Sequence, residues 1–257
     1  MTTRYRAIVS SDWSECLSPS GPFDCLAFNH PEIEADLTAV FRQYTGNQIS
    51  LGQAAAKIKI LLPDPISHDQ MDAYLDASFA TYTGVPDLIQ WCLDNQILFV
   101  INSTGMIGYF QRVLAKKLLP PVPALSAHPM IRYPELNSDP THIYELFETR
   151  GKAQNTETFA RSLGVEPDKI VLIGDSGGDG PHFEWGAESG AHLIGSMTKP
   201  SLDSYCRGKD ITINLRFGPD YSKEEKLDQK MEMAINFMDL APAINKIIGK
   251  KKKKKKK

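Results

Sequence analysis

The sequence of 257 residues contains only four cysteines and no long apolar run. The cysteines are scattered and form no CxxC pair, so the sequence indicates neither a disulfide framework nor a zinc site. The most apolar runs, such as Ile97–Ile101, are far shorter than the roughly 20 residues of a membrane-spanning helix. The polar start of the chain carries no apolar signal segment. We therefore expect a cytoplasmic protein with reduced thiols and no association with membranes.

Motifs of several common enzyme classes are also missing. There is no P-loop, no GxSxG nucleophile elbow, and no interleaving of basic and aromatic residues. The glycine-rich segment Gly174–Gly178 lacks the spacing of a dinucleotide fingerprint. These absences argue against a dinucleotide-binding module and a nucleic-acid-binding protein. The composition, with 42% hydrophobic and 23% charged residues, is ordinary for a globular chain that has one core and an insertion.

The charge of the chain is unevenly distributed. Residues 250–257 are eight consecutive lysines, and without them the net charge of −2 becomes −10. Like charges in such a run repel one another, so we expect a disordered cationic tail on an acidic folded body. The tail could contact nucleic acid or an anionic membrane nonspecifically, or act only as a solubilising segment. We favour the second interpretation, and the sequence does not determine the oligomeric state.

Short apolar runs alternate with helical patterns over most of the chain. Strands are predicted near residues 5–11, 97–101, 124–126, 169–173 and 192–195, and helices include Thr156–Leu163 and one amphipathic stretch after Asp228. This alternation is typical of an α/β fold, a Rossmann-like parallel sheet with helices on both faces. Residues 29–82 have helical patterns and little strand character. We predict a core of residues 1–28 and 83–249, a helical cap of residues 29–82, and a disordered tail of residues 250–257.

Three of the predicted strands end in polar residues that can take part in chemistry. Asp12, Ser103 and Asp175 each follow an apolar run. Ligands of parallel sheets bind at the carboxyl ends of strands, where these side chains should meet. Oxygen ligands of this kind suit Mg²⁺, and Asp179 could support the site. Ser103 lies before a helix start, where hydroxyl and amide groups can bind phosphate, and Lys152 is the natural cation to complete the set.

Four segments in the same order resemble the signature motifs of the haloacid dehalogenase superfamily. They are Ala7–Leu17, which ends in DWSECL, Val100–Gly105, Gly151–Lys152 before a helix, and Ile173–Asp179 with the sequence IGDSGGD. The fourth is the most specific, and the order of all four makes a chance similarity improbable. About ninety residues separate the first two segments and include the helical block. This layout is similar to phosphoserine phosphatases and related members with a helical cap in that position.

The resemblance implies a function and a set of roles. Asp12 would be the nucleophile that accepts the phosphoryl group, while Ser103 and Lys152 would bind its oxygens. Mg²⁺ would be held by Asp12, the backbone carbonyl of Ser14 and Asp175, with Asp179 in support. Phosphoryl transfer depends mainly on positioning and on stabilising spread negative charge, which such groups provide. The expected partner is a small phosphorylated metabolite, and the expected activity is that of a phosphatase.

The first motif departs from the family at one position. Phosphatases of the superfamily have a second aspartate two residues after the nucleophile, and Ser14 stands there. A hydroxyl cannot replace a carboxyl as general acid and base. General acid–base catalysis typically increases the reaction rate by roughly 10²–10⁴-fold. Three interpretations follow: a phosphatase in which another carboxylate, Glu15 being nearest in sequence, replaces the acid; a phosphonatase-like hydrolase whose leaving group needs little protonation; and a pseudophosphatase that binds phosphorylated ligands.

Overall fold

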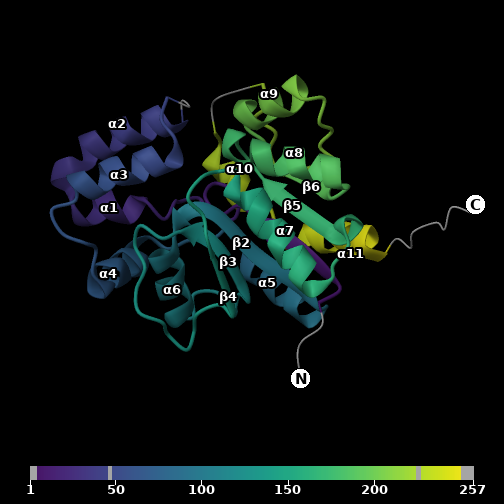
Figure 1. The fold of residues 1–257 in the computed structure, drawn as a ribbon, viewed down its shortest axis with the longest axis horizontal. Coiled ribbons are helices and arrows are strands. Elements are labelled where there is room, and N and C mark those ends of the chain that lie inside the picture. Colours follow the sequence, from purple (N-terminus) through teal and green to yellow (C-terminus); the bar gives the residue numbers. More distant parts are fainter. Residues whose placement is uncertain (1–4, 46–47, 224–226, 250–257) are drawn as a thin grey trace, which may run out of the picture.

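A single parallel sheet lies at the centre of the molecule (Figure 1). The computed structural model describes residues 5–45, 48–223 and 227–249, so the predicted lysine tail lies outside the described residues. The strands of the sheet run in the order β4-β3-β2-β1-β5-β6-β7, and every neighbouring pair is parallel. They are β1 Ala7–Ser11, β2 Ile97–Met106, β3 Ala124–His128, β4 His142–Glu145, β5 Ile170–Gly174, β6 His192–Ser196 and β7 Leu215–Phe217. The predicted α/β class and Rossmann-like sheet are confirmed.

The central strands are apolar because both faces of the sheet are covered. All five residues of β1 and of β5 are buried. Successive side chains of a strand point to opposite faces, and Ile8 and Val9 accordingly belong to two separate hydrophobic clusters. This explains why the strands are continuous apolar runs rather than alternating patterns.

Among the described residues after position 83, seven helices lie between or after the strands. They are α5 Val85–Asp94, α6 Ile107–Ala115, α7 Gly151–Leu163, α8 Gly180–Ser189, α9 Pro200–Gly208, α10 Gln229–Ala234 and α11 Leu240–Gly249. The short η2 Pro167–Lys169, η3 Gly177–Asp179 and η4 Phe237–Asp239 complete this part. No helix in the described part of the chain has the length and apolar character to cross a membrane. The four cysteines are buried and form no disulfide.

Some predicted boundaries were wrong. The helix expected at Thr156–Leu163 begins five residues earlier at Gly151, and the single helix expected after Asp228 is broken. The break between α10 and α11 has a tertiary cause. The side chain of Asn236 accepts a hydrogen bond from Met238, and the backbone N–H of Phe237 donates to Thr83 of another segment. These contacts fix an extended turn that the amphipathic pattern could not reveal.

The block at residues 29–82 contains helices, with no strand among its described residues. After α1 Asp24–Asn29 and the short η1 Pro31–Ile33 come α2 Glu34–Thr45, α3 Leu51–Leu61 and α4 His68–Ser78. Figure 1 shows α1 to α4 gathered at one side of the molecule. Capping boxes of Ser50 with Gln53 and Ser67 with Gln70 begin α3 and α4.

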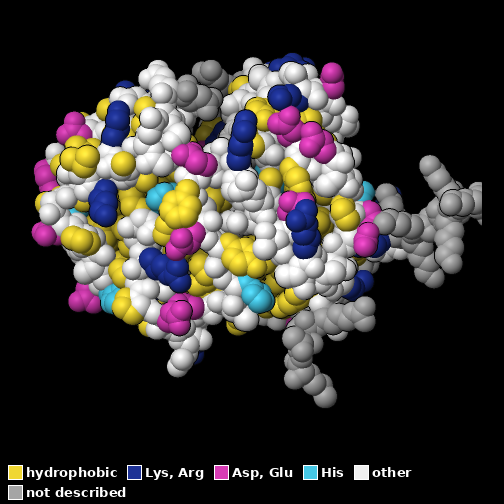
Figure 2. All heavy atoms as spheres, in the orientation of Figure 1, with side chains coloured by type: hydrophobic (Ala, Val, Ile, Leu, Met, Phe, Trp, Pro, Cys, Tyr) yellow, Lys and Arg dark blue, Asp and Glu magenta, His cyan; other side chains and the backbone are white. Residues whose placement is uncertain are grey.

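The two ends of this block are attached to the core differently. α4 is joined to α6 by a bidentate pair of Arg112 with Asp72 (2.8 and 2.7 Å) and by Lys116 with Asp76 (2.9 Å). α2 and α3 pack mainly against each other. Figure 2 shows a hollow in the surface between the side of α2 and α3 and the side of α8 and α9.

Candidate active site

Two aspartates leave neighbouring strands at the same edge of the sheet. Asp12 directly follows β1 and Asp175 directly follows β5. The register pairs Ser11 with Ile173, and the backbone N–H of Asp12 donates to the carbonyl of Ile173 over 3.0 Å. The sheet therefore brings together two carboxylates that are far apart in sequence.

Asp179 completes a buried cluster of three carboxylates. One oxygen each of Asp12, Asp175 and Asp179 lies within 4.8 Å of the others. The Oδ2 atom of Asp179 accepts the backbone N–H of Asp175 over 3.0 Å and that of Ser176 over 3.4 Å. A Cβ atom at Gly174 would lie only 2.6 Å from this carboxylate. The glycine before Asp175 therefore permits the tight turn that folds Asp179 back onto the strand end.

Lys152 joins two of the three carboxylates. It is the second residue of α7, and its side chain is 1% exposed. Its Nζ lies 2.9 Å from Oδ1 of Asp12 and 2.6 Å from Oδ1 of Asp179. A buried ammonium needs such partners, because an unpaired charge away from water is strongly unfavourable. The predicted Lys152 thus lies beside Asp12, with one face of the Asp12 carboxylate engaged.

A buried polar network supports Lys152 from below. Asn102 on β2 donates to the backbone carbonyl of Lys152 over 2.9 Å and to the hydroxyls of Ser10 and Thr156 over 3.1 and 3.0 Å. His182 on α8 lies 3.0 Å from the same Thr156 hydroxyl. Burial lowers the pKa of His182 to about 3, and Lys152 acts in the same direction, so this ring is neutral. The network fixes the start of α7 against the sheet.

Burial dominates the electrostatics of the carboxylates. It raises the pKa of Asp12 to about 6, although Lys152 lowers it, and Asp179 raises it further. Burial also raises the pKa of Asp175 to about 8 against the opposing effect of Lys199. For Lys152, burial opposes the charged form, but Asp12 and Asp179 outweigh it and raise its pKa. Three clustered carboxylates thus carry more negative charge than the protein readily holds without a cation.

The residues present fit a hard divalent cation. The cluster consists of carboxylate oxygens, which Mg²⁺ prefers. Oδ1 of Asp175 is buried and has no hydrogen-bond partner within the described residues. A buried acceptor without a donor calls for an explanation, and a bound cation supplies one. Asp12, Asp175 and Asp179 could therefore hold the metal.

Lys199 is a site residue that the sequence analysis missed. It follows β6 at the start of α9, and its backbone N–H donates to the carbonyl of Asp175 over 2.8 Å. Its Nζ lies 2.8 Å from Oδ2 of Asp175 and also pairs with the carboxylate of Glu15. The only signal was a lysine three residues after a strand end, before a helix that was not predicted. Glu15, considered as a replacement acid, is thus engaged with Lys199.

Ser103 and Ser14 are not joined to the cluster by side-chain contacts. Ser103 is buried in the last part of β2, where its hydroxyl accepts the N–H of Gly105 over 3.0 Å. The Oγ of Ser14 lies 3.3 Å from the point where a Cβ on Gly21 would stand. Neither hydroxyl bonds to Asp12, Asp175 or Asp179 within the part of the chain that the structure describes. The side chain of Ser14 faces the loop before α1.

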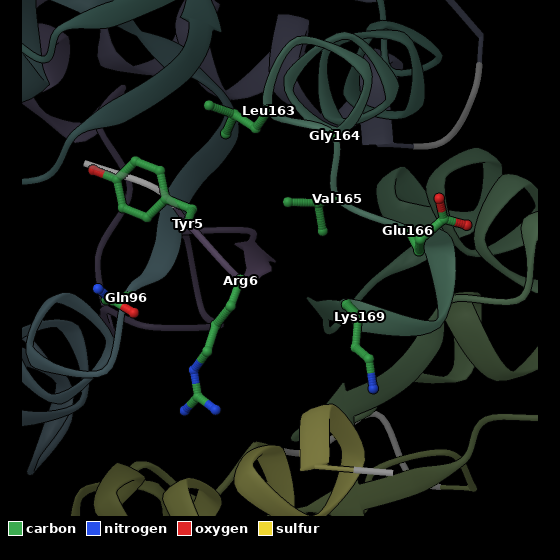
Figure 3. A pocket seen from close by; sticks show the side chains of 8 residues that line it. All are labelled: Tyr5, Arg6, Gln96, Leu163, Gly164, Val165, Glu166 and Lys169. Carbon is green, nitrogen blue, oxygen red and sulfur yellow. The ribbon is translucent and has the colours of Figure 1, made fainter. Parts of the chain in front are cut away.

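A cavity of about 430 Å³ lies elsewhere, at the opposite edge of the sheet (Figure 3). Its lining includes Arg6, which precedes β1, and Lys169, which precedes β5. Arg6 donates to the carbonyl of Asn95 and Lys169 to that of Ile248. The cavity therefore lies at the amino ends of these strands, whereas the carboxylate cluster lies at their carboxyl ends, where ligands of parallel sheets bind. The two places are separate.

Comparison with solved structures identifies the fold. A phosphoserine phosphatase described as a phospho-aspartyl intermediate analogue aligns over 93% of this chain and 99% of its own, with a TM-score of 0.64 and 14% identity. A substrate-bound phosphoserine phosphatase aligns over 93% and 98%, with a TM-score of 0.65 and 13% identity. The chain has the fold of phosphoserine phosphatase. A haloacid dehalogenase family hydrolase from Salmonella enterica serovar Typhi also aligns, over 85% and 69%, with a TM-score of 0.61 and 16% identity.

At the level of sequence the chain stands apart from its structural relatives. It matches no family model and no curated protein sequence. The phosphoserine-phosphatase-like fold confirms the resemblance drawn from the four motifs. At identities of 13 to 16% the likeness concerns the fold, so the activity has to be argued from the site itself.

Proposed function

We propose that this chain is a Mg²⁺-dependent phosphatase that hydrolyses a small phosphorylated metabolite through an aspartyl-phosphate intermediate. The observation that carries the proposal is the contact of Lys152 with Asp12, in a buried site that also contains Asp175 and Asp179. The Asp12 carboxylate lies beside the fixed ammonium of Lys152, and the neighbouring carboxylates are suited to bind a metal cation as well. Such a combination serves the transfer of a dianionic phosphoryl group.

The reaction would proceed in two displacements at phosphorus. In the first, a carboxylate oxygen of Asp12 attacks, the bond between phosphorus and the ester oxygen breaks, and the alcohol leaves with a proton. In the second, water attacks phosphorus and gives a proton to the carboxylate that protonated the alcohol, the bond from phosphorus to Asp12 breaks, and inorganic phosphate leaves. Lys152 would orient Asp12 through Oδ1 and neutralise charge on the transferring group. Mg²⁺, held by Asp12, the Ser14 carbonyl, Asp175 and Asp179, would supply electrophilic stabilisation of that charge.

The proton for the leaving group needs another source, because Ser14 cannot provide it. Glu15 is paired with Lys199, so we assign the role to Asp24. Burial raises the pKa of Asp24, and its carboxylate accepts the N–H of Gly21 over 2.8 Å. The position of a Cβ on Gly21 lies 3.3 Å from Oγ of Ser14 and 3.9 Å from Oδ1 of Asp24. A carboxyl with a raised pKa at the end of the loop that Ser14 faces is suited to donate this proton.

We further propose that the moving part of the cap is the pair α2 and α3. Lid closure in such enzymes excludes water and completes the site. The ion pairs of Arg112 with Asp72 and of Lys116 with Asp76 attach α4 to the core. The moving segment would then be shorter than the predicted cap of residues 29–82.

The test is phosphate release from a panel of phosphomonoesters and phosphonates, with Mg²⁺ and with EDTA, by the native chain and by Asp12→Asn. We expect metal-dependent hydrolysis of phosphomonoesters that Asp12→Asn abolishes. Turnover of phosphonates alone would instead support the phosphonatase-like function that Ser14 leaves open. Binding of Mg²⁺ without turnover of any substrate would overturn the proposal in favour of a protein that only binds phosphorylated ligands.

A further inference from the structure

We propose that Lys199 is a built-in counter-cation that competes with the divalent metal for Asp175, and that Glu15 alone retains its ammonium when the metal binds. The proposal concerns metal binding and rests on the proposed function only for the identity of the metal. It assigns a task to Lys199, which lies outside the four motifs, and to Glu15, whose side chain has no assigned role in the first motif.

The geometry places Lys199 on a carboxylate of the metal cluster. Its Nζ lies 2.8 Å from Oδ2 of Asp175, whose side chain is 1% exposed. The backbone N–H of Lys199 also binds the carbonyl of Asp175. Because the backbone contact anchors the residue, the side chain can leave the carboxylate while the lysine stays beside the site.

The charges of the cluster explain why such a cation is needed. Lys152 contacts Asp12 and Asp179 but makes no ion pair with Asp175 within the described residues. Asp175 would otherwise be a buried carboxylate with an unpartnered Oδ1 and two like charges nearby. Lys199 offsets part of this negative charge, because an ammonium 2.8 Å from Oδ2 favours the ionised form. A divalent cation at the same carboxylate would meet the repulsion of this ammonium.

Glu15 offers the ammonium a second partner on the side facing solvent. Its side chain is 47% exposed, and that of Lys199 is 19% exposed, so the pair lies at the boundary between the buried cluster and water. Glu15 has a backbone φ of 54°, a left-handed conformation that is unfavourable for a residue with a side chain. The loop after Asp12 thus holds Glu15 in a strained position opposite Lys199, where it can keep the ammonium once a metal displaces it from Asp175.

The experiment is calorimetric titration of the full chain with MgCl₂ and MnCl₂, without substrate, for the native protein, Lys199→Met, Glu15→Gln and the double variant. We expect Lys199→Met to bind metal at least about tenfold more tightly, since it removes the competing charge. We expect Glu15→Gln to weaken binding several-fold in the native background and to change it by less than about twofold in the Lys199→Met background, because Glu15 acts through Lys199. Lys209→Met, which removes an exposed lysine paired with Glu184, is the matched control.

Thermal unfolding is a second test that requires no metal titration. In EDTA, Lys199→Met should unfold at a lower temperature than the native chain, and saturating Mg²⁺ should raise its melting temperature by more. Equal or weaker metal binding by Lys199→Met would overturn the proposal. If that variant does not fold, Glu15→Gln alone decides: metal binding by Glu15→Gln that is as tight as in the native chain would overturn the proposal. Metal binding that follows these expectations in a protein without phosphatase activity would refute the proposed function alone.

Discussion

The carboxylate of Glu148 accepts a hydrogen bond from the hydroxyl of Ser50 over 2.7 Å, although 98 residues separate them in sequence. The same carboxylate accepts the backbone N–H groups of Leu51 and Gly52, each over 3.1 Å. An anion at the first turn of a helix is favourable, because free N–H groups and the helix dipole both attract it. Glu148 therefore ties the start of α3 to the loop after β4, which belongs to the core.

We expect Glu148→Gln to loosen α2 and α3 without loosening α4. The substitution removes the charge that the N–H groups of α3 bind, a contribution of about 1 kcal/mol, whereas α4 keeps its ion pairs to α6. Hydrogen exchange followed by mass spectrometry should show faster exchange in Glu34–Leu61 and unchanged exchange in His68–Ser78. Glu145→Gln, which affects a pair with Arg132 at the surface, is the control. Equal acceleration in all three helices would show instead that the cap moves as one body.

Gly52→Ala provides an independent test of the same contact. A Cβ atom at this position would lie 2.9 Å from Oε1 of Glu148, so the carboxylate has to shift. Because it is the end of a flexible side chain, we expect a small loss of overall stability, under about 1 kcal/mol, with the exchange pattern of Glu148→Gln. Gly249→Ala, near the end of α11 with open space around it, is a matched control. Slow exchange of α3 in Gly52→Ala would contradict the role of this contact.

Lys152→Met should abolish activity and lower stability together. It removes the ammonium bound to Asp12 and Asp179 and leaves two buried carboxylates without their partner, a loss of about 3–5 kcal/mol for a buried pair. We expect kcat to fall by at least about 10³-fold, a size typical of lost stabilising groups at a transition state. Steady-state kinetics and urea unfolding measure the two effects. A stable variant with nearly native kcat would exclude Lys152 from the reaction.

The raised pKa of Asp12 predicts opposite pH trends for activity and for stability. Attack requires the carboxylate, so kcat/KM should fall as the pH drops through about 6. Added Mg²⁺ should shift this fall of kcat/KM to lower pH, because a nearby cation favours the ionised form of Asp12. The folded state binds the proton more tightly than the unfolded chain, whose ordinary pKa is 3.8. The contribution of Asp12 to the free energy of unfolding therefore decreases as the pH rises from about 4 to about 6.

Asp12→Asn isolates this contribution to stability. In EDTA, the variant should gain stability relative to the native chain between pH 4 and pH 6, by up to about 3 kcal/mol, the equivalent of moving a pKa from 3.8 to about 6. Urea unfolding at a series of pH values measures the difference. A difference that stays constant over this range would show that Asp12 ionises in the folded protein as it does in the unfolded chain.

Substrates with good and poor leaving groups distinguish the sources of the proton. Asp24→Asn should slow the hydrolysis of alkyl phosphates by about 10²-fold or more. It should slow the hydrolysis of aryl phosphates with acidic phenols much less, because only the alkoxide leaving group needs a proton. Ser14→Asp, which restores a carboxyl two residues after Asp12, should raise the rate of alkyl phosphates and reduce the effect of Asp24→Asn. Asp64→Asn, at an exposed position in the cap, is the control. An equal loss on both substrate classes in Asp24→Asn would assign Asp24 to binding rather than to proton transfer.

The fold and the ends of its central strands could be predicted from the sequence alone. The apolar runs before Asp12 and Asp175 had to be buried on both faces, and a parallel sheet places the residues after such strands at one edge. These features depend on local periodicity and backbone geometry, which a sequence carries directly.

Which charges meet depends on how distant segments pack. Lys199 lies 24 residues after Asp175 in sequence, just before a helix that was not predicted, and it reaches the cluster because β6 pairs with β5. Glu148 binds the start of α3 from another part of the chain, and Glu15 pairs with Lys199. Pairing of this kind depends on the packing of distant segments and on the burial that makes an unpaired charge unfavourable, and neither property is written in a local pattern.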